Sequence, residues 1–119
     1  MLLYAHAGRG VGHASRVAAL GLALVRRHPD MRVAMLTGER RVAALLRGLP
    51  LEWIKLPSYA TAVKDGRSSG AAADCGLSDA DLGAARAELI ASCVRIFRPR
   101  LFVADHTPQG KHRELVPAI

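Results

Sequence analysis

The residues of this chain best suited to chemistry are a histidine in a glycine-rich loop and an acidic residue far along the sequence. The loop spans residues 8–13 and reads Gly-Arg-Gly-Val-Gly-His, and the distant residues are Asp105 and His106. An imidazole that takes a proton and a carboxylate that orients it form a common type of general base. Glycines let backbone amides approach a phosphate or a developing oxyanion closely. These residue types therefore favour proton transfer beside an anionic ligand.

Strands and helices alternate in the pattern that would position these residues. Continuous apolar runs predict buried strands, and apolar residues at helical spacing predict helices. The predicted strands are Met1–Ala5, Arg32–Thr37, Glu52–Leu56 and Leu101–Ala104. The predicted helices are Ala14–His28, Glu39–Arg47 and one from the N-cap Ser78 to about Arg98, with Leu82, Ala85, Leu89, Cys93, Ile96 and Phe97 on its inner face. We therefore expect an α/β fold: a Rossmann-like parallel sheet of about four strands in the order 3-2-1-4, with helices on both faces.

Two segments carry no clear period. Residues 58–76 are rich in Ser, Gly, Ala, Lys and Asp and are expected to form a long loop, mobile or functional. Residues 107–119 could begin another helix. Residues 1–119 are interpreted as a single, partial Rossmann-like domain.

The predicted topology places the two chemical loops in one crevice. Ligands of such sheets bind beyond the C-terminal strand ends where the strand order reverses, here between the first and fourth strands. We predict His13 as the catalytic base, kept neutral by the helix dipole, and Asp105 as its orienting partner. Helix-capping roles are the structural alternative for both. The predicted substrate-binding residues are Gly8, Gly10, Gly12, Arg16 and His106. Tyr59 could also contact a substrate, whereas Trp53 is expected in the core.

Composition narrows the classes of partner and site. The formal charge of +7 favours anionic partners, but only 4% of residues are aromatic, and without interleaved aromatics a nucleic-acid partner is disfavoured. Cys75 and Cys93 form no CxxC motif, so we expect no metal site and free thiols in a reducing compartment. No segment resembles a signal-peptide core or a bilayer span. A cytoplasmic location follows as an expectation.

Known phosphate-binding motifs are absent from the glycine loop. His13 occupies the position of the third glycine in the dinucleotide fingerprint, which disfavours a nicotinamide dehydrogenase. No Gly-Lys-Ser/Thr follows, so the loop is not a P-loop either.

The loop and the helix after it resemble a known enzyme group. Residues 10–16 (Gly-Val-Gly-His-Ala-Ser-Arg), then an Ala/Leu-rich helix ending Arg-Arg-His-Pro-Asp at 26–30, are similar to the N-terminus of bacterial glycosyltransferases of the GT-B type. The group related to family 28, which includes the N-acetylglucosaminyltransferase of peptidoglycan synthesis, typically shows Gly-x-Gly-His and then Arg three residues later. The similarity extends over nearly the whole chain, through residues 36–38, 54–57, 63–66, 98–99, 103–106, 108 and 110.

The resemblance implies sugar transfer from a nucleotide diphosphate, with the nucleotide sugar as co-substrate and no obligatory metal or bound cofactor. Such enzymes have two Rossmann-like domains, with the acceptor on the first and the donor mainly on the second. His13 lies where they place a base or an acceptor-contacting residue. Because the sequence stops after the fourth strand, it corresponds to an incomplete GT-B N-terminal domain, expected to be inactive without a donor-binding domain or chain.

Other partners and functions stay open at this point. The fourth strand would lie at an exposed sheet edge, which could support a homodimer, and the basic charge could support peripheral contact with a membrane. The alternatives to a transferase are a non-catalytic scaffold that recruits a donor-binding partner and a fragment of a nucleotide-sugar epimerase.

Overall fold

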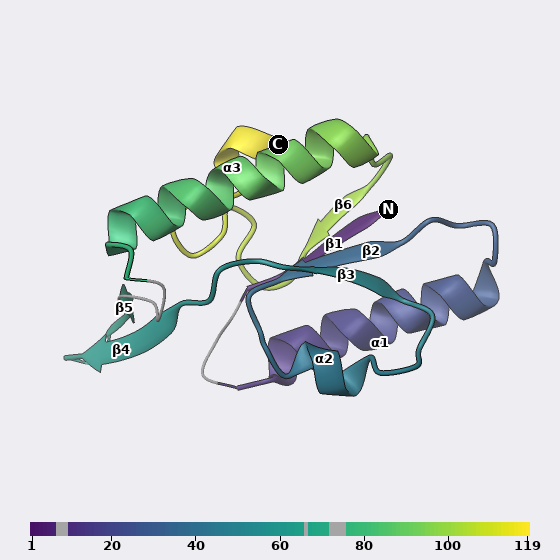
Figure 1. Ribbon diagram of the computed structural model, residues 1–119, viewed down its shortest axis with the longest axis horizontal. Coiled ribbons are helices and arrows are strands. Elements are labelled where there is room, and N and C mark those ends of the chain that lie inside the picture. Colours follow the sequence, from purple (N-terminus) through teal and green to yellow (C-terminus); the bar gives the residue numbers. More distant parts are fainter. Residues whose placement is uncertain (7–9, 66, 72–75) are drawn as a thin grey trace.

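The architecture is a parallel sheet with helices on both faces. The structure is a computed structural model that describes residues 1–6, 10–65, 67–71 and 76–119. Its elements are β1 (Leu2–Ala5), α1 (Gly12–Arg27), β2 (Ala34–Thr37), α2 (Val42–Leu45), β3 (Glu52–Lys55), β4 (Ala60–Lys64), β5 (Arg67–Ala71), α3 (Asp79–Phe97), β6 (Phe102–Ala104) and the 3₁₀ turn η1 (Val116–Ala118). Figure 1 shows α3 and η1 on one face of the main sheet, and α1 and α2 on the other.

The main sheet confirms the predicted strand order. Its strands run β3-β2-β1-β6 and all pair in parallel. Leu3 in β1 lies opposite Met35 in β2 on one side and Val103 in β6 on the other. The chain therefore leaves the sheet centre in one direction to build β2 and β3, and in the other to build β6. This places the predicted reversal point between β1 and β6.

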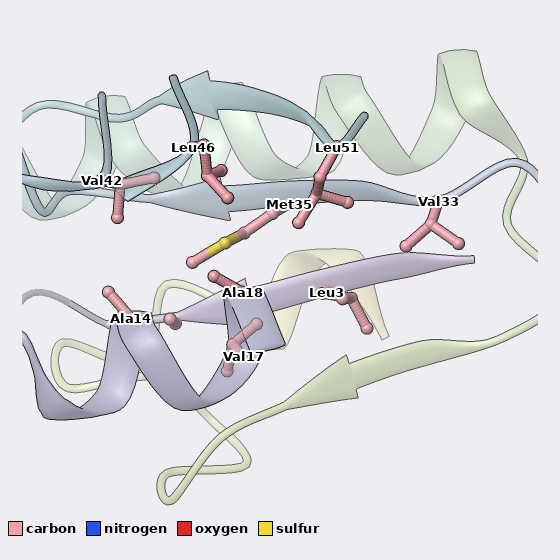
Figure 2. Packing of buried hydrophobic residues seen from close by; sticks show 10 residues of the cluster. Leu3, Ala14, Val17, Ala18, Val33, Met35, Val42, Leu46 and Leu51 are labelled. Atoms are coloured by element: carbon pink, nitrogen blue, oxygen red, sulfur yellow. The ribbon is translucent and has the colours of Figure 1, made fainter. Parts of the chain in front are cut away.

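Alternate residues of the central strands build two separate cores. Leu3 and Met35 face α1 and α2, whereas Leu2 and Leu36 face α3. The side chains of the first core interdigitate closely (Figure 2). Its buried members are Leu3, Ala5, Ala14, Val17, Ala18, Val33, Met35, Val42, Leu46 and Leu51. Because both faces of β1 and β2 are covered, these strands show apolar runs without alternation.

Gly21 sets the distance between α1 and the first core. A Cβ at this position would lie 2.8 Å from Cδ2 of Leu51 and 3.1 Å from Cδ1 of Leu3. Only a residue without a side chain lets the helix lie so close to the sheet.

The ends of α3 follow the predicted signals. Ser78 caps the helix, and its Oγ accepts the backbone N–H of Asp81 at 3.1 Å. At the other end Arg98 adopts a left-handed conformation with φ of 44°, and Pro99 follows it.

The predicted inner face of α3 is correct only in part: Leu82 is buried and Cys93 packs against the core on this side of the sheet. Its fully buried stripe is Leu82, Arg86 and Ile90, residues spaced by four. Ile96 and Phe97 are instead 74% and 53% exposed, and Leu89 is exposed as well. The helix is rotated relative to the prediction because its middle buried residue is an arginine, which a count of apolar residues leaves out.

Two further segments differ from the expectations. Within the stretch expected to be a long loop, β4 and β5 form an antiparallel hairpin with Ala62 opposite Ser69, and Figure 1 shows it projecting beyond the main sheet. Small and polar residues give this hairpin little hydrophobic alternation, so its period is invisible in the sequence. The C-terminal segment forms only η1 rather than a helix.

The predicted helix over Glu39–Arg47 is a single turn, α2. The carboxylate of Glu39 accepts both the backbone N–H of Arg41 at 3.0 Å and its Nε at 2.7 Å. These bonds hold Glu39 outside the helix. Gly48 has φ of 71° and closes the segment before β3. None of the helices in the described part of the chain is long and apolar enough to cross a membrane.

Candidate functional site

The site lies where β1 and β6 end at the same edge of the sheet. His6 follows β1, and Asp105 and His106 follow β6. His13 is the second residue of α1, the helix that begins beyond β1. Because parallel strands deliver their C-terminal ends to one edge, residues separated by more than ninety positions meet there.

His13 and Asp105 form a direct pair, as the sequence predicted for their placement. Nδ1 of His13 lies 2.6 Å from Oδ2 of Asp105. The backbone N–H of Asp105 donates to the carbonyl oxygen of Tyr4 at 3.0 Å, which ties the carboxylate to the end of β1. When Nδ1 is the protonated ring nitrogen and donates to the carboxylate, Nε2 is left as the proton acceptor. The imidazole keeps 27% of its side-chain surface exposed, so a ligand can reach it.

Arg16, one turn further along α1, also contacts Asp105. Its Nη2 donates to Oδ2 of Asp105 at 3.1 Å. The same Nη2 lies 3.1 Å from Nδ1 of His13, so Arg16 and Asp105 both contact the same ring nitrogen. Partial burial acts to raise the pKa of Asp105, but the hydrogen bonds from His13 and Arg16 outweigh it and hold that pKa below its usual range. Asp105 is therefore charged at neutral pH.

Two more imidazoles surround His13. Its ring centroid lies 4.7 Å from that of His6 and 5.2 Å from that of His106. Burial, and then the electrostatic influence of His13 and Lys111, lower the pKa of His6. Its Nδ1 is buried and has no hydrogen-bond partner among the described residues. His6 is thus a neutral wall of the site rather than a second charged group.

His106 bonds to its neighbour Thr107 rather than to Asp105. Its Nδ1 lies 3.1 Å from Oγ1 of Thr107, the next residue. Its backbone has φ of 70°, a left-handed conformation that non-glycine residues adopt rarely. This conformation turns the chain sharply after Asp105. Within the described ranges, no group of three or more His, Cys, Asp or Glu side chains is arranged to hold a metal ion.

The described part of the glycine loop is open. A Cβ at Gly10 or at Gly12 would meet nothing within 4 Å. Helix α1 begins at Gly12 without a side-chain cap and without an acidic residue in its first turn. The positive end of the helix dipole therefore favours an anion beside His13. Gly8, the third predicted glycine contact, lies outside the described residues.

The side chain of Tyr59, which the sequence suggested could contact a substrate, points into the protein. Its side chain is buried, and its hydroxyl donates to Oε1 of Glu114 at 3.1 Å. The guanidinium of Arg86 lies 4.3 Å from the centroid of its ring. Tyr59 belongs to the interior of the protein. Trp53, expected in the core, is partly buried against the α1-side cluster.

Sequence reasoning missed a buried polar cluster behind the site. Arg86 and Glu114, which are 0% and 1% exposed, lie with Nη2 and Oε1 at 3.4 Å. The Tyr4 hydroxyl joins them, donating to Glu114 at 2.7 Å and accepting from Arg86 at 3.0 Å. Burial acts to raise the pKa of Glu114, but the hydrogen bond from Tyr4, backbone N–H donors and Arg86 hold it below its usual range. The one signal in the sequence was Arg86 itself, midway between Leu82 and Ile90 on a helical stripe.

The arrangement as a whole can remove a proton next to a bound anion. His13, hydrogen-bonded to Asp105, lies at the uncapped N-terminus of α1, an arrangement suited to a general base with an orienting carboxylate. Comparison of the chain with models of known protein families, with curated proteins and with solved structures found no match.

Proposed function

We propose that this chain forms the acceptor side of a nucleotide-sugar-dependent glycosyltransferase, with His13 as the base. The observation that carries the proposal is the 2.6 Å hydrogen bond between Nδ1 of His13 and Oδ2 of Asp105 at the opening of α1. This bond leaves Nε2 of His13 directed away from the carboxylate and able to take a proton from a hydroxyl group.

The chemical step follows from that geometry. Nε2 of His13 takes the proton of an acceptor hydroxyl as its oxygen attacks the anomeric carbon of the sugar. The bond from that carbon to the nucleoside diphosphate breaks, and the diphosphate leaves with the bonding electrons. The imidazolium that results is stabilised by the charged carboxylate of Asp105, whose pKa is depressed by His13 and Arg16 although partial burial opposes this. No group other than the two substrates is needed to balance the step.

Positive potential around the base supports an anionic substrate. The side chain of Arg16 is largely exposed and spans from α1 to Asp105. Together with the N-terminus of α1 it stabilises negative charge developing at this edge of the sheet. The open backbone at Gly10 and Gly12 allows close approach. The nucleotide sugar itself would be held mainly by a second Rossmann-like domain or chain, in keeping with the resemblance of residues 10–16 to GT-B enzymes.

The test uses the full natural protein together with any donor-binding domain or chain it associates with. Release of nucleoside diphosphate is measured with UDP-, GDP- and dTDP-sugars against a panel of hydroxyl acceptors. His13→Ala is expected to lower kcat roughly 10²–10⁴-fold, the contribution typical of a general base. Asp105→Asn should reduce kcat less, because the base remains but loses its orienting charge.

The matched control is His28→Ala. His28 is an exposed histidine that follows the other end of α1, where it lies beyond the sheet edge opposite the site. It should leave turnover unchanged. If His13→Ala transfers sugar as fast as the unaltered protein, the assignment of the base is wrong.

A further inference from the structure

The segment after β6 is a folded-back loop that carries Asp105 at one end and Glu114 at the other. The backbone N–H of Leu115 donates to the carbonyl oxygen of Gln109 at 3.0 Å, which closes the second half of the loop. Leu115 is fully buried against the α3 side of the sheet. The loop therefore has a fixed start, at the end of β1, and a fixed end, under α3.

Glu114 ties this loop to several parts of the protein at once. Its carboxylate accepts the hydroxyls of Tyr4 and Tyr59 and the guanidinium of Arg86. These donors come from β1, from the segment after β3 and from α3. Its second oxygen, Oε2, accepts the backbone N–H of His112 at 2.7 Å, within the loop itself. A buried carboxylate with donors on both oxygens fixes direction as well as position.

Gly110 shows how tightly the loop wraps around that carboxylate. Its φ of 78° is left-handed, and a Cβ there would lie 2.5 Å from Oε2 of Glu114. Arg113, next to Glu114, is left-handed too, with φ of 59°. Non-glycine residues hold such conformations only where surrounding contacts over-determine them. The loop is therefore held in its shape by Glu114 rather than by its own backbone preference.

Tyr4 connects this anchor to the catalytic pair. Its hydroxyl donates to Glu114, and its carbonyl oxygen accepts the backbone N–H of Asp105. One residue of β1 thus contacts both ends of the loop. The start of the loop, which carries Asp105, and its end, held by Glu114, are therefore both fixed against Tyr4, whereas the position of His13 is set separately by α1.

We propose that Glu114, held in place by Arg86, is a positioning residue that fixes the loop after β6 so that the carboxylate of Asp105 meets His13. No atom of Glu114 takes part in the reaction. Its effect on turnover rests on the proposed function, but its effect on Asp105 does not, so the two are tested separately.

The decisive pair of variants is Gly110→Ala and Gly48→Ala. Both substitutions place a methyl group on a glycine with positive φ, but a Cβ at Gly48 would meet nothing within 4 Å. Gly48 precedes β3, at the sheet edge away from the site. The readout is the pKa of the Asp105 carboxyl, followed by NMR. Gly110→Ala should raise that pKa towards its ordinary value, because the hydrogen bonds from His13 and Arg16 are lost, and Gly48→Ala should leave it in place.

Tyr59→Phe provides a milder variant should Gly110→Ala fail to fold. It removes one donor to Glu114 and keeps the ring beneath Arg86. It should raise the pKa of Asp105 in the same direction by a smaller amount. An Asp105 pKa that stays depressed in Tyr59→Phe, and in Gly110→Ala where this is folded, overturns the proposal.

Kinetics add a readout that a purely structural role would not move. For the folded variants kcat should fall while KM for the nucleotide sugar is unchanged, because only the orientation of the base is affected. If the unaltered protein transfers no sugar, the proposed function fails, and the titration of Asp105 still decides whether Glu114 positions it.

Discussion

Removing the charge of Arg86 should leave the buried Glu114 carboxylate without a compensating charge and so destabilise the fold. Arg86→Met keeps most of the volume of the side chain and removes its charge. The Glu114 carboxylate, which is 1% exposed, then keeps the Tyr4 and Tyr59 hydroxyls and its backbone N–H donors but loses the one cation paired with it among the described residues. Removing one partner of a buried ion pair typically costs about 3–5 kcal/mol. That loss is a large part of the roughly 5–15 kcal/mol that stabilises a domain.

The double variant measures the coupling free energy between Arg86 and Glu114 apart from their contacts with other residues. Glu114→Gln leaves Arg86 buried but still bonded to the carbonyl oxygen of Pro57 and to Tyr4. With both changes present no unpaired charge remains, so the combined loss should be smaller than the sum of the single losses by about 0.5–3 kcal/mol. The 3.4 Å separation of Nη2 and Oε1 is long, so Tyr4, which bonds to both, carries part of this coupling.

Unfolding in urea, followed by the fluorescence of the single tryptophan Trp53, measures these free energies. The pH dependence provides a second check. In Arg86→Met the stranded carboxylate can escape its penalty by taking a proton, so the loss should shrink as the pH falls from about 7 to about 4. Strictly additive losses with no pH dependence would show that water reaches the carboxylate, and the reasoning from burial would be refuted.

Four further outcomes follow from single residues. Burial and neighbouring positive groups lower the pKa of His6, so as the pH falls the unfolded chain takes up a proton on His6 before the folded protein does. The free energy of unfolding should therefore fall as the pH drops through about 6.5, and His6→Gln should remove that fall in urea titrations. The depressed pKa of Asp105, which the hydrogen bonds from His13 and Arg16 produce against partial burial, adds stability above a pH of about 4 that is lost below it, so Asp105→Asn should show a flatter acid limb in thermal melts. Gly21→Ala should lower the urea midpoint, because overpacking against Leu51 costs about 1–3 kcal/mol and exceeds the gain in helix propensity. Gly83→Ala, whose new Cβ would sit 3.5 Å from its nearest neighbour, should raise the midpoint.

The sheet, and the placement of His13 next to Asp105, could be predicted because both follow from the strand topology. Apolar runs without alternation indicate strands covered on both faces, and a strand order that reverses after the third strand places the ends of β1 and β6 together. The contact of His13 with Asp105 needs only that order, with Asp105 directly after β6 and His13 at the start of α1. The order of side chains within a strand mattered little for this inference.

The buried polar cluster was not predicted, because most of its members are of residue types usually found at the surface and their partners are distant in sequence. Arg86 lies in a helix that also holds Ile96 and Phe97, so a count of apolar residues turns the wrong face inward. Only partners distant in sequence make burial of Arg86 favourable: Tyr4 is 82 residues away and Glu114 is 28. Tyr59 was misassigned for the same reason, since the acceptor for its hydroxyl is 55 residues away. Periodicity in a sequence reflects packing within one helix or strand, whereas this cluster joins side chains from separate elements.

The buried polar cluster and the pair of His13 and Asp105 are nevertheless connected. An apolar replacement for Arg86 and Glu114 could stabilise the fold equally well, since buried ion pairs rarely add net stability over packed hydrophobic residues. An apolar residue at position 114, however, would not bond to the backbone N–H of His112 or to the Tyr4 hydroxyl. The loop after β6 would then lose the directional contacts that hold it on β1, where Asp105 bonds to the backbone of the same Tyr4. A charged cluster at this position is therefore explained by the orientation it imposes on Asp105, and a protein with an apolar cluster here would be stable but would hold its carboxylate loosely against His13.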